Sequence, residues 1–154
     1  MAMKKTKLRM LTALAVVAAV ASITFAAVTG TTAIKERQQA MEDIGKAMQA
    51  FGAIAKKQAP FDADVVKASA ETIANRLNEA ADLFPDGSDT GDVETWAKPE
   101  IWSDRENFDK DLATAAAAAV AMQSVTDEAA FGPALGALGN GCKTCHDAYR
   151  RPKK

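Results

Sequence analysis

The chain contains 154 residues, of which 19 are basic and 20 are acidic, and its formal net charge is −1 at pH 7. This length supports one compact domain with a single core and excludes a second domain. Nucleic-acid binding is also excluded, because it calls for a clustered basic face. The basic residues at 150–154 form only a short charged terminus.

Residues 1–26 have the features of a cleavable secretory signal peptide. A positively charged start at Lys4–Arg9 precedes an apolar stretch at Leu11–Ala21, and Thr24-Phe25-Ala26 places small residues at the cleavage position. Cleavage there removes four basic residues and leaves 15 basic against 20 acidic residues. The mature domain at 27–154 is therefore expected to be mildly acidic.

An uncleaved membrane anchor is the alternative interpretation of this stretch, because apolar residues continue to Val28. A spanning helix needs about 20 predominantly apolar residues, and Thr12, Ser22 and Thr24 interrupt the run. The sequence therefore favours cleavage and export of the mature chain to the periplasm.

Two helical segments are expected in the first half of the mature chain, where apolar residues recur at spacings of three and four. The first covers 34–57 and ends before Pro60. The second begins with Asp62 or Asp64 as its N-cap and continues to Phe84. No segment of the chain alternates as a strand would.

Two more helices follow a long connection at 85–99 that is rich in Gly, Asp and Thr. One is predicted to begin at Ser103-Asp104-Arg105-Glu106, a capping box in which the serine hydroxyl and the glutamate satisfy free backbone amides, and to reach Met122. The other covers 131–149, where Pro133 is acceptable only in the first turn. Four amphipathic helices of similar length predict an all-α protein, a four-helix bundle.

The most informative motif is Cys142-Lys143-Thr144-Cys145-His146, which contains the only two cysteines and the only histidine of the chain. C-x-x-C-H is the attachment motif of a c-type haem, in which both thiols bond to the vinyl groups and the imidazole takes an axial position on iron. Both cysteines lie on the core-facing stripe of the last predicted helix, so one covalent haem c is expected inside the bundle.

Other interpretations of the two cysteines are weaker. A structural zinc site needs about four ligands, and the pentapeptide offers three. A thioredoxin-like redox pair lies beside a βαβ pattern, which is absent here. A disulfide across two intervening residues closes so short a loop that it stabilises little.

Three glycines, Gly136, Gly139 and Gly141, precede the motif, although glycine in a helix costs about 1 kcal/mol relative to alanine. Close approach of a flat ring or of a neighbouring helix explains them. Local fraying or irregularity of the helix is the alternative, especially at Gly136.

Arg37 occupies a core-facing position of the first helix, where a charge is costly unless it is paired. A haem propionate is the expected partner, and Gln38 could supply a second polar contact. The alternative is an arginine whose guanidinium reaches solvent.

Met41 lies one turn beyond Arg37 on the same stripe, so a carboxylate held by Arg37 places Met41 near the iron. Its thioether is a candidate sixth ligand, which gives a low-spin centre with a raised potential. Methionine at helical spacing is more often plain core, and Met48 and Met122 are interpreted in that way.

The whole mature chain from about Ile34 to Arg151 resembles the class II cytochromes c, the cytochrome c' family. The segments that carry the resemblance are Arg37-Gln38 with Met41, Gln58-Ala59-Pro60-Phe61-Asp62, Ala97-Lys98-Pro99-Glu100-Ile101-Trp102-Ser103, and Cys142-Lys143-Thr144-Cys145-His146-Asp147-Ala148-Tyr149-Arg150. The acidic segment 82–96 is longer than the family pattern, which leaves open whether Glu94 or Thr95 approaches the haem edge.

The resemblance implies an antiparallel bundle in the periplasm, with covalent haem c and His146 as the proximal ligand. It also implies that Arg37 and Gln38 contact the propionates and that Arg150 lies beside the proximal histidine. The family has a low-spin branch, in which a methionine of the first helix binds iron, and a high-spin branch with an open sixth site. Relatives of this kind often pair into dimers through their first two helices, and the sequence does not decide whether this chain does.

The function expected from these observations is transfer of one electron between periplasmic or membrane-bound redox proteins. The alternative is a five-coordinate, high-spin cytochrome c' that binds nitric oxide or carbon monoxide. A haem-free interaction bundle would leave the pentapeptide without purpose. No enzyme activity is expected, because with its histidine on iron and both cysteines consumed the chain lacks an obvious general base or nucleophile.

Overall fold

The computed structural model describes residues 17–152, with side chains described from Gly30 onward. Its helices in chain order are α1 (Val17–Ala55), α2 (Ala63–Ala80), the short 3-10 helix η1 (Ala81–Leu83), α3 (Glu100–Ser103), α4 (Arg105–Met122) and α5 (Glu128–Tyr149). Within residues 17–152 no strand occurs, and the single β-type contact is an isolated bridge between Ala97 and Arg150. The predicted all-α class is confirmed.

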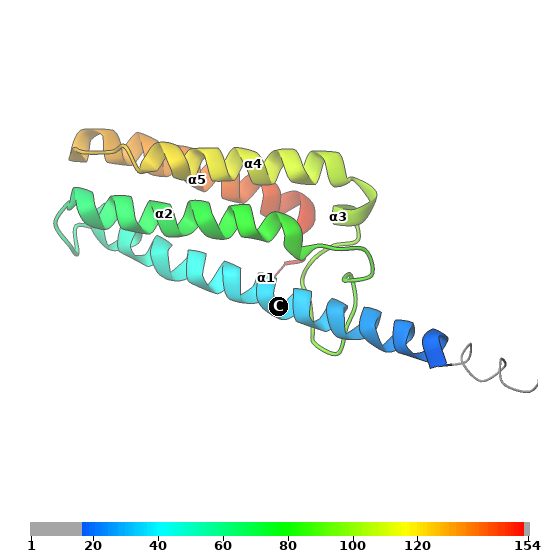
Figure 1. The fold of residues 1–154 in the computed structure, drawn as a ribbon. Helices are drawn as coiled ribbons and strands as arrows, with labels where there is room; N and C mark the ends of the chain where they lie inside the picture. Colours follow the sequence, from blue (N-terminus) through cyan, green and yellow to red (C-terminus); the bar gives the residue numbers. More distant parts are fainter. Residues whose placement is uncertain (1–16, 153–154) are drawn as a thin grey trace, which may run out of the picture.

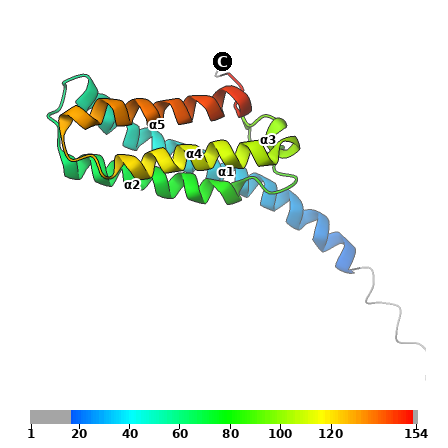
Figure 2. The same cartoon turned by 90° about the horizontal axis from the view of Figure 1, so that it is seen from above.

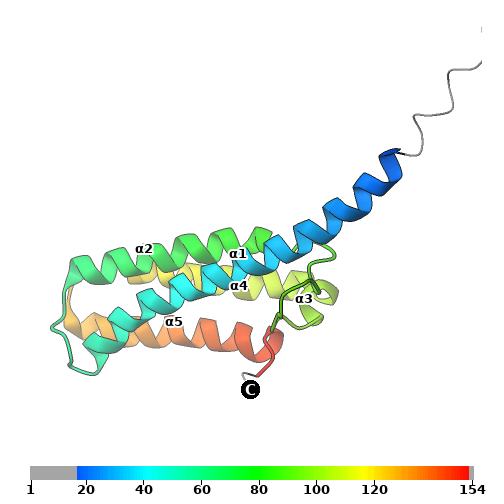
Figure 3. The ribbon, with the colours of Figure 1, turned by 90° about the horizontal axis from the view of Figure 1, so that it is seen from below.

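The four long helices form an antiparallel bundle (Figure 1). α1 packs on α2, α2 on α4 and α4 on α5, whereas α1 and α5 make little close backbone contact. Figure 2 shows α2, α4 and α5 in this order, and Figure 3 shows α1 and α5 from the opposite side. The predicted four-helix bundle is confirmed.

α1 is longer than the helix expected at its position. Its helical backbone begins at Val17, continues through the predicted cleavage position at Ala26, and ends at Ala55. The N-terminal part extends beyond the bundle (Figure 1), and the first 16 residues of the predicted leader lie outside the described part of the chain. From residue 17 to residue 152, no helix is both long enough and apolar enough to cross a membrane.

Aspartate side chains cap the N-termini of α2 and α5. The Asp62 carboxylate accepts hydrogen bonds from the backbone amides of Asp64 and Val65 at 2.9 and 3.1 Å, so the N-cap of α2 is Asp62 and not Asp64. Asp127 accepts from the amide of Ala130 at 2.9 Å and caps α5. Both side chains satisfy amides that lack a partner within the helix.

The capping box predicted at Ser103 is wrong. Ser103 ends the short helix α3, and Asp104 occupies the cap position of α4 without a side-chain hydrogen bond to a backbone amide. The Asp104 carboxylate instead accepts hydrogen bonds from Asn107 Nδ2 at 2.8 Å and from the Tyr149 hydroxyl at 3.2 Å. A contact with α5 has therefore taken the side chain away from the local capping role.

Pro133 lies in the interior of α5, and its predicted place in the first turn is also wrong. The reason is the Asp127 cap, which starts the helix at Glu128, three residues before the predicted start. Proline has no N–H to give to the carbonyl four residues earlier, which belongs to Ala129. Ala129 is exposed, so water can satisfy that carbonyl.

The core is continuous along the bundle, with an aromatic cluster near each end. Phe131 makes edge-to-face contacts with Phe51 and Phe61 at the end near the α1–α2 loop. At the other end, near α3, Phe84 and Phe108 lie with their ring centroids 4.8 Å apart. Such T-shaped pairs add to the free energy gained from burial.

Gly141 allows close approach of α4 and α5. A Cβ at this position would lie 3.1 Å from Ala115 Cα and 3.4 Å from Ala115 Cβ. The expectation of a neighbouring helix is therefore correct for Gly141. Gly136 and Gly139 have nothing within 4 Å of such a Cβ.

The Asp62 cap predicts the first measurable effect. Asp62→Ala is expected to lower the free energy of unfolding by about 1 kcal/mol, because two amides of α2 lose their acceptor. Asp64→Ala is the matched control, since this first-turn acid contributes only through the helix dipole, about 0.3–1 kcal/mol. Guanidinium unfolding of both variants measures the difference, and equal losses would contradict the assigned cap.

The glycine contacts predict a difference of sign. Gly141→Ala is expected to destabilise the bundle by about 1–3 kcal/mol, because the new methyl group meets the backbone of α4. Gly136→Ala is expected to stabilise it by up to about 1 kcal/mol, since the site is exposed and alanine favours the helix. Thermal unfolding of the two variants tests this contrast. Stabilisation by Gly141→Ala would contradict the close approach of α4 and α5 at this position.

Candidate functional site

The pentapeptide lies in the last two turns of α5. Residues three and four apart share one face of a helix, so Cys142, Cys145 and His146 lie together. The two spacer residues are exposed: Lys143 forms an ion pair with Asp147, and the Thr144 hydroxyl donates to the carbonyl of Asn140 at 3.0 Å. The helix therefore separates two thiols and an imidazole from the polar spacer.

α5 is buried less completely than its neighbours. Its buried residues are Phe131, Leu138 and Tyr149, although it has 22 residues, whereas α2 and α4 each bury six with 18 residues. Cys142 and Cys145, which were predicted to face the core, are half-buried against it, as is Leu135. This face of α5 combines two thiols with a partly covered apolar surface, and such a donor set suits a covalently attached planar group.

Burial keeps both thiols in the neutral form. It raises the pKa of Cys145 to about 11, and the negative charge of Asp111 and the neighbouring Cys142 add to the shift. Burial also raises the pKa of Cys142. At neutral pH both sulfurs therefore carry their protons.

His146 is held in its neutral form by the same surroundings. Burial lowers its pKa below the usual value, the positive charge of Arg150 lowers it further, and Asp147 opposes the change. A neutral imidazole is the form that binds a metal ion. Arg150 is thus close enough to His146 to act on it electrostatically.

Arg37 is buried, with 4% of its surface exposed, so the alternative of a guanidinium in solvent is wrong. It donates to Ser88 Oγ and to the Ser88 carbonyl at 3.1 and 2.8 Å, to Thr95 Oγ1 at 2.9 Å, and to the Leu83 carbonyl at 3.3 Å. The guanidinium also lies over the rings of Phe84 and Trp102. All four hydrogen bonds go to neutral oxygens.

The cost of this burial is visible in the pKa of Arg37. Desolvation lowers the pKa to about 10, and the negative charge of Asp89 partly opposes the change. The side chain is still cationic at neutral pH. Sequence reasoning missed Ser88 as a partner, because nothing in the local pattern links a loop serine to a helix 51 residues earlier.

The connection between η1 and α3 makes further contacts with α1 besides those of Arg37. Gln38 Nε2 donates to the Glu94 carbonyl at 2.7 Å, and the Asp92 amide donates to Thr31 Oγ1 at 3.1 Å. Gly91 lies so close that an added Cβ would be 2.9 Å from Ile34 Cδ1. The long segment is therefore an ordered cover on α1.

The same connection also caps the end of α5. Lys98 Nζ donates to the carbonyls of Asp147 and Ala148, both at 2.9 Å, and the Lys98 amide donates to the Tyr149 carbonyl at 2.9 Å. A cation at this end of a helix also complements its dipole. Lys98 thus supports the turn that follows His146, a role that its sequence position alone does not indicate.

Met41 is half-buried and packs against the core, as Met48 does. Both lie on α1, which is seen with α5 on the same side of the bundle in Figure 3. Gln38 and Arg150 are exposed.

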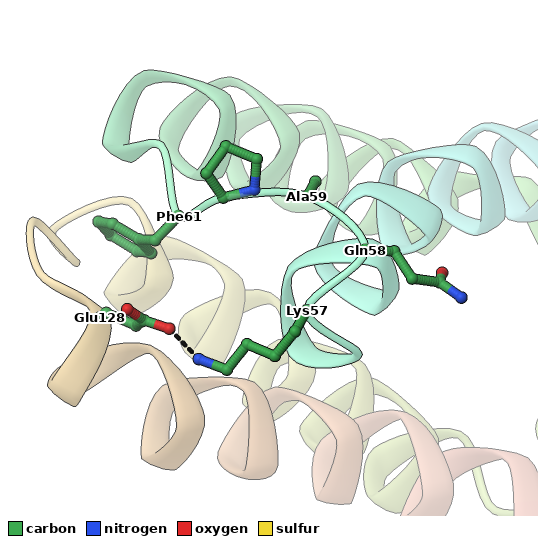
Figure 4. A pocket seen from close by; sticks show the side chains of 6 residues that line it. Lys57, Gln58, Ala59, Phe61 and Glu128 are labelled. Atoms are coloured by element: carbon green, nitrogen blue, oxygen red, sulfur yellow. Dashed lines mark hydrogen bonds and ion pairs between the residues drawn. The ribbon is translucent and has the colours of Figure 1, made fainter.

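Two open hollows on the surface lie away from the pentapeptide. One, of about 570 Å³, is lined by Lys57, Gln58, Ala59, Pro60, Phe61 and Glu128 at the far end of the bundle, where Lys57 pairs with Glu128 (Figure 4). The other, of about 520 Å³, lies between α1 and α2 and has a mainly charged and polar rim. Neither contains a thiol or an imidazole, so neither competes with α5 as the cofactor site.

The chain matches the family model described as Cytochrome C' over residues 32–150. It is 42% identical over 125 residues to cytochrome c-556 of Agrobacterium fabrum, covering 78% of this chain and 82% of the relative. It is 38% identical over 128 residues to cytochrome c' of Rhodopseudomonas palustris, covering 82% of this chain and 87% of the relative.

Solved structures agree with these matches. Cytochrome c' from Rhodopseudomonas palustris superimposes with a TM-score of 0.76 at 37% identity, covering 79% of this chain and 98% of the other. The structural model of oxidised cytochrome c556 from the same species gives a TM-score of 0.70 at 28% identity, with 79% and 98% covered. With its thiols and imidazole on the last helix of the same four-helix bundle, the chain belongs to the cytochrome c' family.

Proposed function

We propose that this chain is a mono-haem c-type cytochrome that carries one electron between redox proteins. Cys142 and Cys145 hold the haem through thioether bonds, and His146 is the proximal ligand. The observation that carries the proposal is the placement of two neutral thiols and a neutral imidazole on one half-buried face of α5. The relatives named cytochrome c-556 and cytochrome c' support it.

The residues of the chain divide the work of such a site. Bound haem supplies an iron that gains and loses one electron. α5 fixes the ring through two side chains, and Asp147 and Arg150 set the charge around His146. The packed core behind the cysteines excludes water. A dry environment would favour the oxidation state in which the haem site has the lower net charge.

The propionate groups are assigned to Arg37 and Gln38. Arg37 is a buried cation whose described hydrogen bonds all go to neutral oxygens, so its charge lacks a hydrogen-bonded anion. A carboxylate close to it would recover part of the desolvation cost. Gln38 lies next in the chain, and its Nε2 donates one hydrogen to the Glu94 carbonyl. The residue is exposed, so the second hydrogen of the amide is accessible to another propionate oxygen.

Export completes the proposal. Residues 1–26 direct the chain to the periplasm and are removed, which leaves the domain at 27–154. The donor and acceptor are periplasmic or membrane-bound redox proteins.

Gas binding is the second candidate function. It is favoured by the relatives named cytochrome c' and by a solved nitric oxide complex of the L16V mutant of cytochrome c prime from Alcaligenes xylosoxidans, 29% identical with a TM-score of 0.71. In this case Met41 only covers an open sixth position on iron. The two candidates differ at one bond, between the Met41 sulfur and iron.

Covalent attachment is tested by the fate of the pigment. Protein exported from a host that attaches haem is expected to stay coloured after extraction with acidified organic solvent. The double variant Cys142→Ser/Cys145→Ser is expected to lose its pigment in that step, because no thioether can form. Lys143→Ala is the control within the same pentapeptide and is expected to stay coloured; free extraction of the pigment from the unaltered protein would refute the proposal.

Met41→Ala distinguishes the two candidate functions. If Met41 ligates iron, the unaltered protein has a sharp low-spin optical spectrum, and the variant becomes high-spin and binds carbon monoxide at least about tenfold faster, because a coordination position has opened. Met48→Ala controls for the loss of a half-buried methionine from the same helix and is expected to stay low-spin. A Met41→Ala protein that remains low-spin excludes Met41 as ligand, and an unaltered protein that is already high-spin favours gas binding.

A further inference from the structure

Tyr149 is the only tyrosine of the chain, and the proposed function gives it no role. It follows His146 by three residues and Cys145 by one helical turn, and only 6% of its surface is exposed. Residues four apart on a helix have their Cβ atoms about 5–6 Å apart. The phenol is therefore next to the side chain that would carry one thioether bond.

The phenol has a proton acceptor. Its hydroxyl donates to Asp104 Oδ2 at 3.2 Å, while Asp104 Oδ1 accepts from Asn107. Asp104 is exposed at the start of α4, so a proton passed to this carboxylate can continue to solvent. A buried phenol that donates to a carboxylate, which in turn contacts water, can lose an electron and a proton together.

Tyr149 also begins a chain of aromatic rings. Its ring centroid lies 5.3 Å from that of Phe108, Phe108 lies 4.8 Å from Phe84, and Phe84 lies 6.0 Å from Trp102, all edge to face. Phenylalanine is much harder to oxidise than a phenol or an indole. The two oxidisable ends of this chain are therefore Tyr149 and Trp102.

The surroundings favour Tyr149 over Trp102 as an electron donor. The Arg37 guanidinium lies 5.7 Å from the Trp102 ring, and its charge opposes a positive charge left on the indole. The Trp102 Nε1–H donates to the Pro85 carbonyl at 3.0 Å, and an amide carbonyl is a poor base for the released proton. Tyr149 faces a carboxylate instead of a cation.

We propose that Tyr149, with Asp104 as its proton acceptor, donates one electron to the haem site when hydrogen peroxide reacts there. Reduction of peroxide to two waters takes two electrons and two protons. Ferrous iron supplies one electron and becomes ferric, and Tyr149 supplies the other and becomes a neutral tyrosyl radical. The Tyr149 proton passes to Asp104 and on to solvent, and solvent supplies both protons that the peroxide takes up, so the net uptake is one proton. This role rests on the proposed haem attachment at Cys142 and Cys145.

The experiment treats reduced holoprotein with one equivalent of hydrogen peroxide, freezes it within milliseconds and records its electron paramagnetic resonance spectrum. A tyrosyl radical is expected, and Tyr149→Phe is expected to lower that signal at least about tenfold. Asp104→Asn is expected to lower its yield several-fold, because the proton acceptor is lost, and Trp102→Phe to leave it within about twofold. A signal that survives Tyr149→Phe, or is lost only in Trp102→Phe, overturns the proposal.

Two measurements keep the result interpretable. Protein grown on ring-deuterated tyrosine must show a narrowed signal, because Tyr149 is the sole tyrosine, and this requires no substitution that could disturb folding. An unchanged line shape refutes the assignment. The optical spectrum of each sample shows whether haem is attached, so colourless protein contradicts the proposed function, whereas coloured protein without a radical contradicts only the role of Tyr149.

Discussion

At the end of the bundle near α3, the relation between α1 and α5 depends on the buried guanidinium of Arg37. The two helices make little direct backbone contact, and Arg37 holds the long connection on α1 through Ser88 and Thr95. The same connection continues to Lys98, which donates to carbonyls at the end of α5. A buried cation without partners costs several kcal/mol. Loss of the hydrogen bonds between Arg37 and the connection would therefore be costly, and this cost keeps the connection on α1. Together with the contact between Phe51 and Phe131 at the other end, these contacts position the helix of Met41 relative to the helix that bears the cysteines.

The features that sequence alone predicted are those set by neighbours in the chain. The recurrence of apolar residues at three and four gave the four long helices, because an amphipathic helix repeats every 3.6 residues. Asp62 was one of two predicted caps for α2, since a cap depends on amides two and three residues away. The C-x-x-C-H motif is local in the same sense, and α5 places its members on one face. The close contact at Gly141 was predicted because glycine within a helix is costly and therefore calls for a reason such as a neighbouring helix.

The features that sequence did not predict depend on contacts between distant segments. Ser103 fits the capping pattern, but α3 ends there and the adjacent Asp104 is drawn to Tyr149, 45 residues later. The partners of Arg37 come from a connection whose Gly, Asp and Thr content predicts only a loop. The incomplete burial of Cys142 likewise cannot be read from periodicity, which gives the face of a helix but not how fully its neighbours cover it.

Half-burial of the cysteine face suits two demands on the electron carrier proposed above. The site must be dry enough to hold a neutral imidazole and a packed ring, and the core packed behind α5 keeps water from that side. The ring must also lie near the surface for a partner to reach it. α2 and α4 are covered by protein along their inner faces, whereas protein atoms leave part of the cysteine face of α5 uncovered. That uncovered part is where the proposed haem would lie.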